Sequence, residues 1–100
     1  MTNLSIIQDL SDSGRHQECL QACQNALDVD PENASIYKLA GSSLLALGQS
    51  ERAHDFLNHA HQLDESDYEV AKHIGNIYLS QGFHEDAIRW YQKSLSINPH

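Results

Sequence analysis

The chain of 100 residues has little of several residue types, and each shortage excludes a class of protein. Only six Lys and Arg stand against 14 Asp and Glu, which gives a formal net charge of -8. Binding to the phosphates of a nucleic acid requires clustered basic side chains, so we expect no nucleic-acid partner. No apolar run approaches the roughly 20 residues that a helix needs to cross a bilayer, so we expect no membrane span.

Cysteines and catalytic motifs are also scarce. The two cysteines, Cys19 and Cys23, lie four residues apart in a stretch of helical periodicity, where a mutual disulfide would require distortion. Reduced thiols and the lack of a secretory signal pattern predict a cytoplasmic protein. We find no nucleophile elbow, no phosphate-binding glycine loop and no His-Glu-x-x-His motif. The sequence therefore predicts a protein that is not an enzyme and that needs no cofactor.

What the sequence does contain is a period of 34 residues. Gly14, Gly48 and Gly82 are one period apart, and so are Gly41 and Gly75. A fixed period of this length indicates an array of units, each of which buries its apolar face against its neighbours. Gly41 and Gly75 fall inside expected helices, where Gly costs about 1 kcal/mol relative to Ala. We therefore expect the paired helix to approach closely at these two positions.

Each period reads as two helices joined by a tight turn, without any strand pattern. In the middle unit we expect helices from about 34 to 47 and from about 50 to 63, with Gly48 between them. Asn33 and Ser50 lie where these two helices begin and are predicted to be their N-caps. In the next unit Asp67 is the corresponding cap.

The third unit shows a family pattern most completely, with Ala71-x2-Ile74-Gly75-x2-Tyr78, then Ala87-x3-Tyr91, then Pro99. This pattern resembles the tetratricopeptide repeat, a 34-residue helix-turn-helix unit. The second unit follows the pattern less closely, and the first departs at its aromatic and glycine positions. The resemblance implies an all-α, right-handed α-solenoid: a single domain with three repeats at about residues 1–33, 34–67 and 68–100.

In this family the first helices line a concave groove that holds an extended peptide or a partner helix. The resemblance therefore implies a protein-interaction module, with a groove lined by Gln8, Ser35, Lys38, Leu39, Ser42, Leu45, Glu69, Lys72, His73, Asn76 and Leu79. Lys38 and Lys72 lie in it, whereas most acidic residues, Asp67 included, are expected on the convex side. This arrangement favours a protein or peptide partner with a carboxylate or an acidic residue. The alternative is that the two lysines merely reflect repeat duplication.

Chaperone-binding members of the family clamp a C-terminal carboxylate with Lys and Asn on the first unit, Asn on the second, and Lys and Arg on the third. The corresponding positions here hold Leu4, Gln8, Leu39, Glu69 and His73. None of them matches, and although Lys72 and Asn76 reproduce the first pair two periods later, two further units would be needed to complete the clamp. We therefore expect that the chain is not a receptor for chaperone tails.

Two groups of potential metal ligands have a simpler structural explanation. The first group, on one helical face, comprises His16, Cys19 and Cys23. The period assigns both cysteines to core positions, where a free thiol packs as a small hydrophobe. The second group comprises His54, His59 and His61, whose spacings point in different directions on a helix, and we interpret it as a solvated surface. We predict no metal site.

The last expected helix is rich in apolar residues, whereas repeat arrays normally end on a polar face. We therefore expect an exposed self-association surface made by Ile74, Ile77, Tyr78, Tyr91 and Leu95. Two alternatives to a stand-alone binding module follow. The chain is a scaffold that forms homo-oligomers through this surface, or it is the N-terminal repeat segment of a longer protein, an enzyme included.

Overall fold

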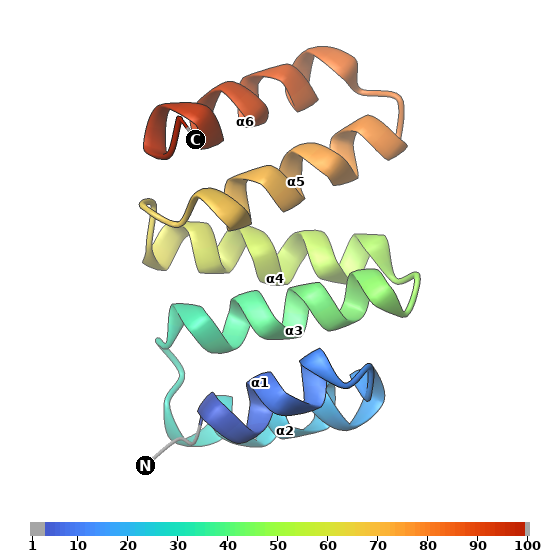
Figure 1. Cartoon of the computed structure of the whole chain (residues 1–100), viewed down its shortest axis with the longest axis vertical. Helices are drawn as coiled ribbons and strands as arrows, with labels where there is room; N and C mark the ends of the chain where they lie inside the picture. Colours follow the sequence, from blue (N-terminus) through green and yellow to red (C-terminus); the bar gives the residue numbers. More distant parts are fainter. Residues whose placement is uncertain (1–3, 100) are drawn as a thin grey trace.

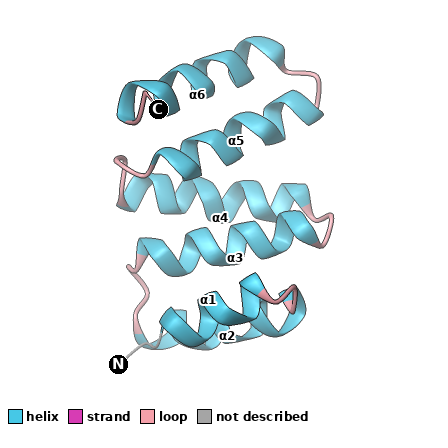
Figure 2. Cartoon of the chain, viewed as in Figure 1, coloured by secondary structure: helices cyan, strands magenta, loops and turns pink. Residues whose placement is uncertain are grey.

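Six helices, each antiparallel to the next, form the whole described structure. The computed structural model describes residues 4–99, with the helices α1 (Leu4–Asp12), α2 (His16–Val29), α3 (Ala34–Ala46), α4 (Ser50–Leu63), α5 (Tyr68–Ser80) and α6 (His84–Ile97). Along the long axis α2 to α6 follow one another in chain order, while α1 overlaps α2 in this view (Figure 1), and the body measures 38 × 25 × 22 Å. Residues 4–99 contain no strand (Figure 2), and none of their helices has both the length and the apolar character to cross a membrane. The predicted all-α helical-repeat solenoid is confirmed.

A tight turn joins the two helices of each repeat. The three glycines one period apart have φ angles of 78°, 79° and 84°, at Gly14, Gly48 and Gly82. In the middle turn the N–H of Gly48 bonds to the oxygen of Leu45 at 3.0 Å, and the N–H of Gln49 bonds to that of Leu44 at 2.9 Å. These two bonds form a Schellman motif, which requires the left-handed conformation that glycine adopts without steric cost.

The N-cap of α4 is Gln49, and its side chain makes no capping hydrogen bond. The prediction that Ser50 caps this helix is therefore wrong. The turn is so short that the residue completing the Schellman motif of α3 also begins α4, and Ser50 is already helical.

Side-chain caps begin the first helix of the second and third repeats. Oδ1 of Asn33 accepts hydrogen bonds from the N–H groups two and three residues later, at 3.0 and 3.4 Å. Oδ1 of Asp67 does the same at the start of α5, also at 3.0 and 3.4 Å. Both predicted caps are confirmed, and they satisfy amide groups that have no partner inside the helix.

The core runs through all three repeats, and glycines allow the paired helices to meet closely within it. A Cβ atom at Gly41 would lie 2.6 Å from Cγ of Leu57 on α4, and one at Gly75 would lie 2.9 Å from Cε1 of Tyr91 on α6. The expected close approach is confirmed, because neither position has room for a side chain.

Ile74 and Ile77 are fully buried members of this core. The prediction that they line an exposed surface at the C-terminal end is therefore wrong. Their counterparts one period earlier, Ala40 and Ser43, are equally buried. Because α5 packs against both α4 and α6, this side of α5 is already covered.

Candidate protein-interaction surface

The first helices of successive repeats form one face of the molecule, which we call the first-helix face (α1, α3 and α5). Helix α1 contacts α3, and ion pairs join α3 to the start of α5. An open hollow of about 310 Å³ lies between α1 and α3, lined by Leu4, Ser5, Gln8, Ser35, Lys38 and Leu39. Four of these lining residues belong to the predicted groove: Gln8, Ser35, Lys38 and Leu39.

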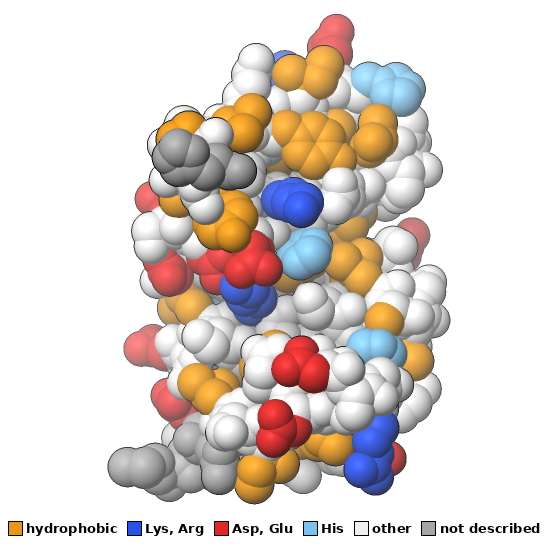
Figure 3. Space-filling view, viewed as in Figure 1, with side chains coloured by type: hydrophobic (Ala, Val, Ile, Leu, Met, Phe, Trp, Pro, Cys, Tyr) orange, Lys and Arg blue, Asp and Glu red, His pale blue; other side chains and the backbone are white. Residues whose placement is uncertain are grey.

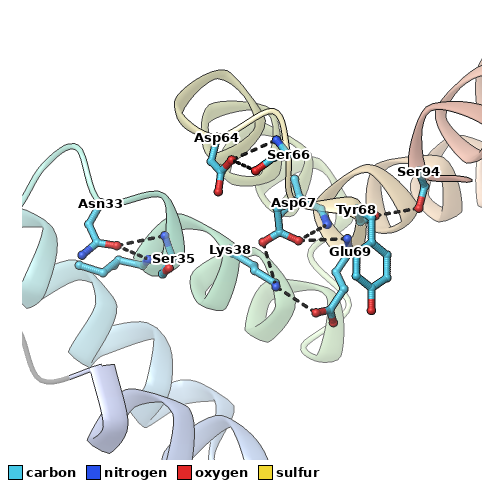
Figure 4. A network of polar contacts seen from close by, with 11 residues as sticks. Asn33, Ser35, Lys38, Asp64, Ser66, Asp67, Tyr68, Glu69 and Ser94 are labelled. Carbon is cyan, nitrogen blue, oxygen red and sulfur yellow. Dashed lines mark hydrogen bonds and ion pairs between the residues drawn. The ribbon is translucent and has the colours of Figure 1, made fainter. Parts of the chain in front are cut away.

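Lys38 is held by two carboxylates at the α3–α5 boundary (Figure 4). Its Nζ lies 3.0 Å from Oδ2 of Asp67 and 3.2 Å from Oε1 of Glu69. Burial acts to lower the pKa of Lys38, but the two carboxylates outweigh it and hold this pKa above its usual value. The side chains of Lys38 and Asp67 are each only 25% exposed.

Two expectations about charge are corrected by this cluster. Asp67 lies beside Lys38 and not on a convex surface, and its carboxylate both caps α5 and pairs with the lysine. Lys38 is therefore not an available cation, and the face is not cationic at this point. Basic and acidic side chains accordingly meet in the middle of the surface that Figure 3 shows.

Lys72 differs from Lys38 because Lys72 is exposed and forms no ion pair with any residue in 4–99.

His73, the next residue on α5, is half-buried, and this burial lowers its pKa. Lys38 and Lys72 lower this pKa further, while Glu69 and Asp67 oppose them. The Tyr91 hydroxyl of α6 donates a hydrogen bond to Oδ1 of Asn76, which leaves the Asn76 amide group free to donate outward.

Most of the other predicted groove residues are at least partly accessible, but Leu39 is buried in the core. Ser42 and Leu45 on α3 are half-buried, and Leu79 near the end of α5 is exposed. The sequence therefore identified accessible positions on the first helices, but it did not identify the carboxylates that neutralise Lys38.

The histidines of α4 do not form the solvated surface that we predicted. His54 meets Tyr78 of α5 edge-on, with ring centroids 5.0 Å apart, and His61 meets Trp90 of α6 at 4.9 Å. Nε2 of His54 and Nδ1 of His61 are buried without a hydrogen-bond partner in the described structure. Only His59 is exposed, and it stacks on Tyr37 at 4.2 Å. The period could have predicted the burial of His54 and His61, because they lie one period after Leu20 and Leu27, which pack in or against the core.

Cys19 and Cys23 are buried, as predicted. Sγ of Cys19 contacts the carbonyl oxygen of Ile7 at 3.6 Å. Burial, with Cys19 adding to it, raises the pKa of Cys23 to about 12, so this thiol stays protonated at neutral pH. Residues 4–99 bring no group of three His, Cys, Asp or Glu side chains together in a way that could hold a metal ion.

An exposed apolar surface lies at the C-terminal end. Of the residues predicted there, Leu95 is 58% exposed, whereas Tyr78 and Tyr91 are half-buried. The sequence interpretation missed Ile88 and Phe83, which are 53% and 55% exposed. Ile88 could have been found from the period, because it lies 34 residues after His54.

Comparison with known families agrees with this architecture. A profile of the tetratricopeptide repeat matches residues 68–100. Among curated proteins, the probable biofilm formation methyltransferase WspC of Pseudomonas aeruginosa is 28% identical over 88 residues, which are 88% of this chain and 21% of that protein. The human protein O-mannosyl-transferase TMTC1 is 26% identical over 87 residues, which are 87% of this chain and 10% of that protein. The chain thus spans only a small part of each relative.

Solved repeat structures superpose on nearly the whole chain. The MamA protein has a TM-score of 0.89 with 26% identity, over 96% of this chain and 52% of that one. The first repeat domain of Spaghetti (RPAP3), bound to the HSP90 peptide SRMEEVD, has a TM-score of 0.89 with 20% identity, over 96% of this chain and 76% of that one. Three helix pairs in one register, the profile match at the third pair and these superpositions identify the architecture: the chain has a tetratricopeptide-repeat fold, and its residues 68–100 match the tetratricopeptide repeat family.

Proposed function

We propose that the chain is a non-catalytic module that holds a segment of a partner protein against the first-helix face. The observation that carries this proposal is the open hollow between α1 and α3, on a face where polar and charged side chains lie beside apolar ones. The peptide-bound repeats of Spaghetti support a protein-binding role for this fold in general. They supply no ligand for this chain.

The charges on the face indicate what the partner segment carries. On the first-helix face Lys72 pairs with no carboxylate among residues 4–99, and Asn76, one turn away, offers an amide donor. A carboxylate is the group that both can bind, through a charge-assisted hydrogen bond and a neutral one. The net charge of -8 repels acidic segments elsewhere on the molecule, so we infer that recognition is centred on this pair.

A displayed library of random peptides, with selected sequences remade and titrated by calorimetry, tests this function. We expect selection of peptides with Asp, Glu or a free C-terminus, and we expect Lys72→Glu to weaken their binding by about tenfold or more. The matched control is Arg52→Glu, the same charge reversal on α4, which should leave the affinity nearly unchanged. Amidated peptides distinguish a terminal carboxylate from an acidic side chain. Equal binding by both variants would remove Lys72 from the site.

A second proposal is that the repeats are one segment of a longer protein. The lengths of the curated relatives favour it, because the matched regions are only 21% and 10% of those proteins. The mass of the endogenous protein, measured with an antibody against the repeats, decides between a larger protein and one near 11.2 kDa.

A further inference from the structure

The outer face of α6 is exposed, whereas the equivalent faces of α2 and α4 are covered by neighbouring helices. Two residues seven apart recur with the period on each second helix: Leu20 and Leu27 on α2, His54 and His61 on α4, and Ile88 and Leu95 on α6. The first two pairs lie against described neighbours. Ile88 and Leu95 are 53% and 58% exposed, so they are stacking residues with no described helix upon them.

Further apolar side chains continue this face. Phe83 and Leu79 are exposed at the α5–α6 turn, and Tyr91 is half-buried between Ile88 and Leu95 along the helix. We call the exposed members of this set the C-terminal face (Leu79, Phe83, Ile88 and Leu95), beside which the ring of Tyr91 packs on Gly75 of α5. In Figure 3 hydrophobic side chains gather over the α5–α6 end of the molecule. Soluble monomers rarely leave contiguous apolar side chains in this way unless the surface binds something.

The charge of the chain is segregated away from this face. Residues 1–67 contain 11 Asp and Glu and three Lys and Arg, for a formal charge of -8, whereas residues 68–100 contain three of each, for zero. Two copies of so acidic a chain repel one another over most of their surface. They avoid this repulsion when their third repeats meet, because the acidic repeats then lie at opposite ends of the pair.

The pattern of apolar residues on α6 is also complementary to itself. Ile88 and Leu95 are separated by two helical turns, with Tyr91 and Gln92 midway between them. When two α6 helices pack antiparallel about a two-fold axis near residues 91 and 92, Ile88 of each copy meets Leu95 of the other. An interface of this kind uses the same patch on both copies and closes at two.

We propose that the C-terminal face joins two copies of this chain through antiparallel packing of their α6 helices. The proposal does not depend on peptide binding to the first-helix face. Because the face is about one helix wide, it buries less than the roughly 800 Å² per partner of standard stable complexes. The dimer is therefore expected to be reversible and to depend on concentration.

Sedimentation equilibrium over a wide concentration range, from roughly 1 µM to 1 mM, tests the dimer. We expect the mass to rise from 11.2 kDa towards twice that value. Ile88→Glu with Leu95→Glu should weaken the association by more than about tenfold, because truncating or charging central apolar contacts removes most interface energy. The matched control is Val29→Glu, the same change at an apolar residue of α2 that is 71% exposed. Helical circular dichroism of all variants verifies that they fold.

Disulfide trapping tests the register. Gln92→Cys lies beside the proposed axis and should give a cross-linked dimer under mild oxidation, whereas Gln62→Cys on α4 should not. A chain that stays monomeric at the highest concentration overturns the proposal. So does a dimer that survives the double Glu substitution, or a mass that grows beyond two copies, since continued growth indicates head-to-tail stacking. Lys72→Glu should leave the dimer intact, which separates this test from that of the proposed function.

Discussion

The first and second repeat junctions use the same positions for different chemistry. At the α2–α3 junction the stacking positions hold Leu20 and Leu27, and Leu20 is 5% exposed within the core. At the α4–α5 junction they hold His54 and His61, which meet aromatic rings edge-on, and one ring nitrogen of each has no hydrogen-bond partner among residues 4–99. The packing between helices is also more extensive at the first junction.

This difference shows that a repeat array need not be uniformly stable along its length. Each repeat is stabilised mainly by its neighbours, so the strength of each junction is a separate quantity. The first junction buries aliphatic carbon, which responds little to pH or salt. The second relies on imidazole rings and on the Lys38 ion pairs, which respond to both.

Truncation of a stacking residue should therefore be most harmful at the first junction. We expect Leu20→Ala to lower the free energy of unfolding by about 2–5 kcal/mol, as for other buried leucines. The equivalent His54→Ala should cost only about 0.5–1.5 kcal/mol, mostly through its lost contact with Tyr78. Urea unfolding at micromolar protein concentration measures both. Equal losses would mean that the two junctions do not differ in strength.

Leucines introduced at the second junction should make it resemble the first. His54→Leu with His61→Leu removes two buried nitrogens that lack partners, and we expect a gain of about 1 kcal/mol in the free energy of unfolding at neutral pH. His59→Leu on the same helix is the control, because His59 is exposed, and it should change stability little. A loss of stability in the double variant would show that the aromatic contacts of the imidazoles outweigh their desolvation.

Mild acid should weaken the second junction before the first. Burial, with Lys93 assisting and Glu65 and Asp64 opposing, lowers the pKa of His61, and the pKa of His73 is also lowered. Near their ordinary pKa of about 6.5 these histidines take up protons more readily in the unfolded chain, so stability falls as the pH drops through this value.

Hydrogen exchange between about pH 7.5 and about pH 5.5, corrected for intrinsic rates, measures this effect. We expect protection to fall first for the amides of α5 and α6, and we expect the double leucine variant to retain more of it. A uniform fall in all six helices would assign the acid sensitivity to the whole array.

The smallest effect is expected from the ion pairs at Lys38. Lys38→Met should cost at most about 1 kcal/mol, as exposed or partly exposed pairs usually do, and less in high salt. Lys72→Met provides the control, because Lys72 pairs with no described carboxylate. Thermal unfolding in low and high salt measures the difference, and an effect independent of salt would assign Lys38 a packing role.

The period of 34 residues was sufficient to predict the helices, the glycine turns and the close approach at Gly41 and Gly75. These features repeat, and each depends on contacts within a repeat or at a fixed offset from it. The environments of Lys38 and Ile74 could not be predicted in the same way. A helical pattern shows which residues share a face, but the neighbour that covers this face depends on how successive repeats stack. The carboxylate of Asp67 illustrates this, since its cap follows from local sequence but its lysine partner comes from another repeat.

The two kinds of turn differ in how they should accommodate added residues. Within each repeat, one residue both completes the end of the first helix and begins the second. Gln49 completes the Schellman motif of α3 and is the N-cap of α4, so an insertion there would disrupt one of these two roles. Between repeats, different residues end one helix and begin the next: Asp30 and Asp64 are C-caps, Asn33 and Asp67 are N-caps, and the exposed Glu32 and Glu65 lie between them. A fluorescent reporter or an affinity tag placed in the chain is therefore best accommodated between repeats, just before these caps, where the register on either side is preserved.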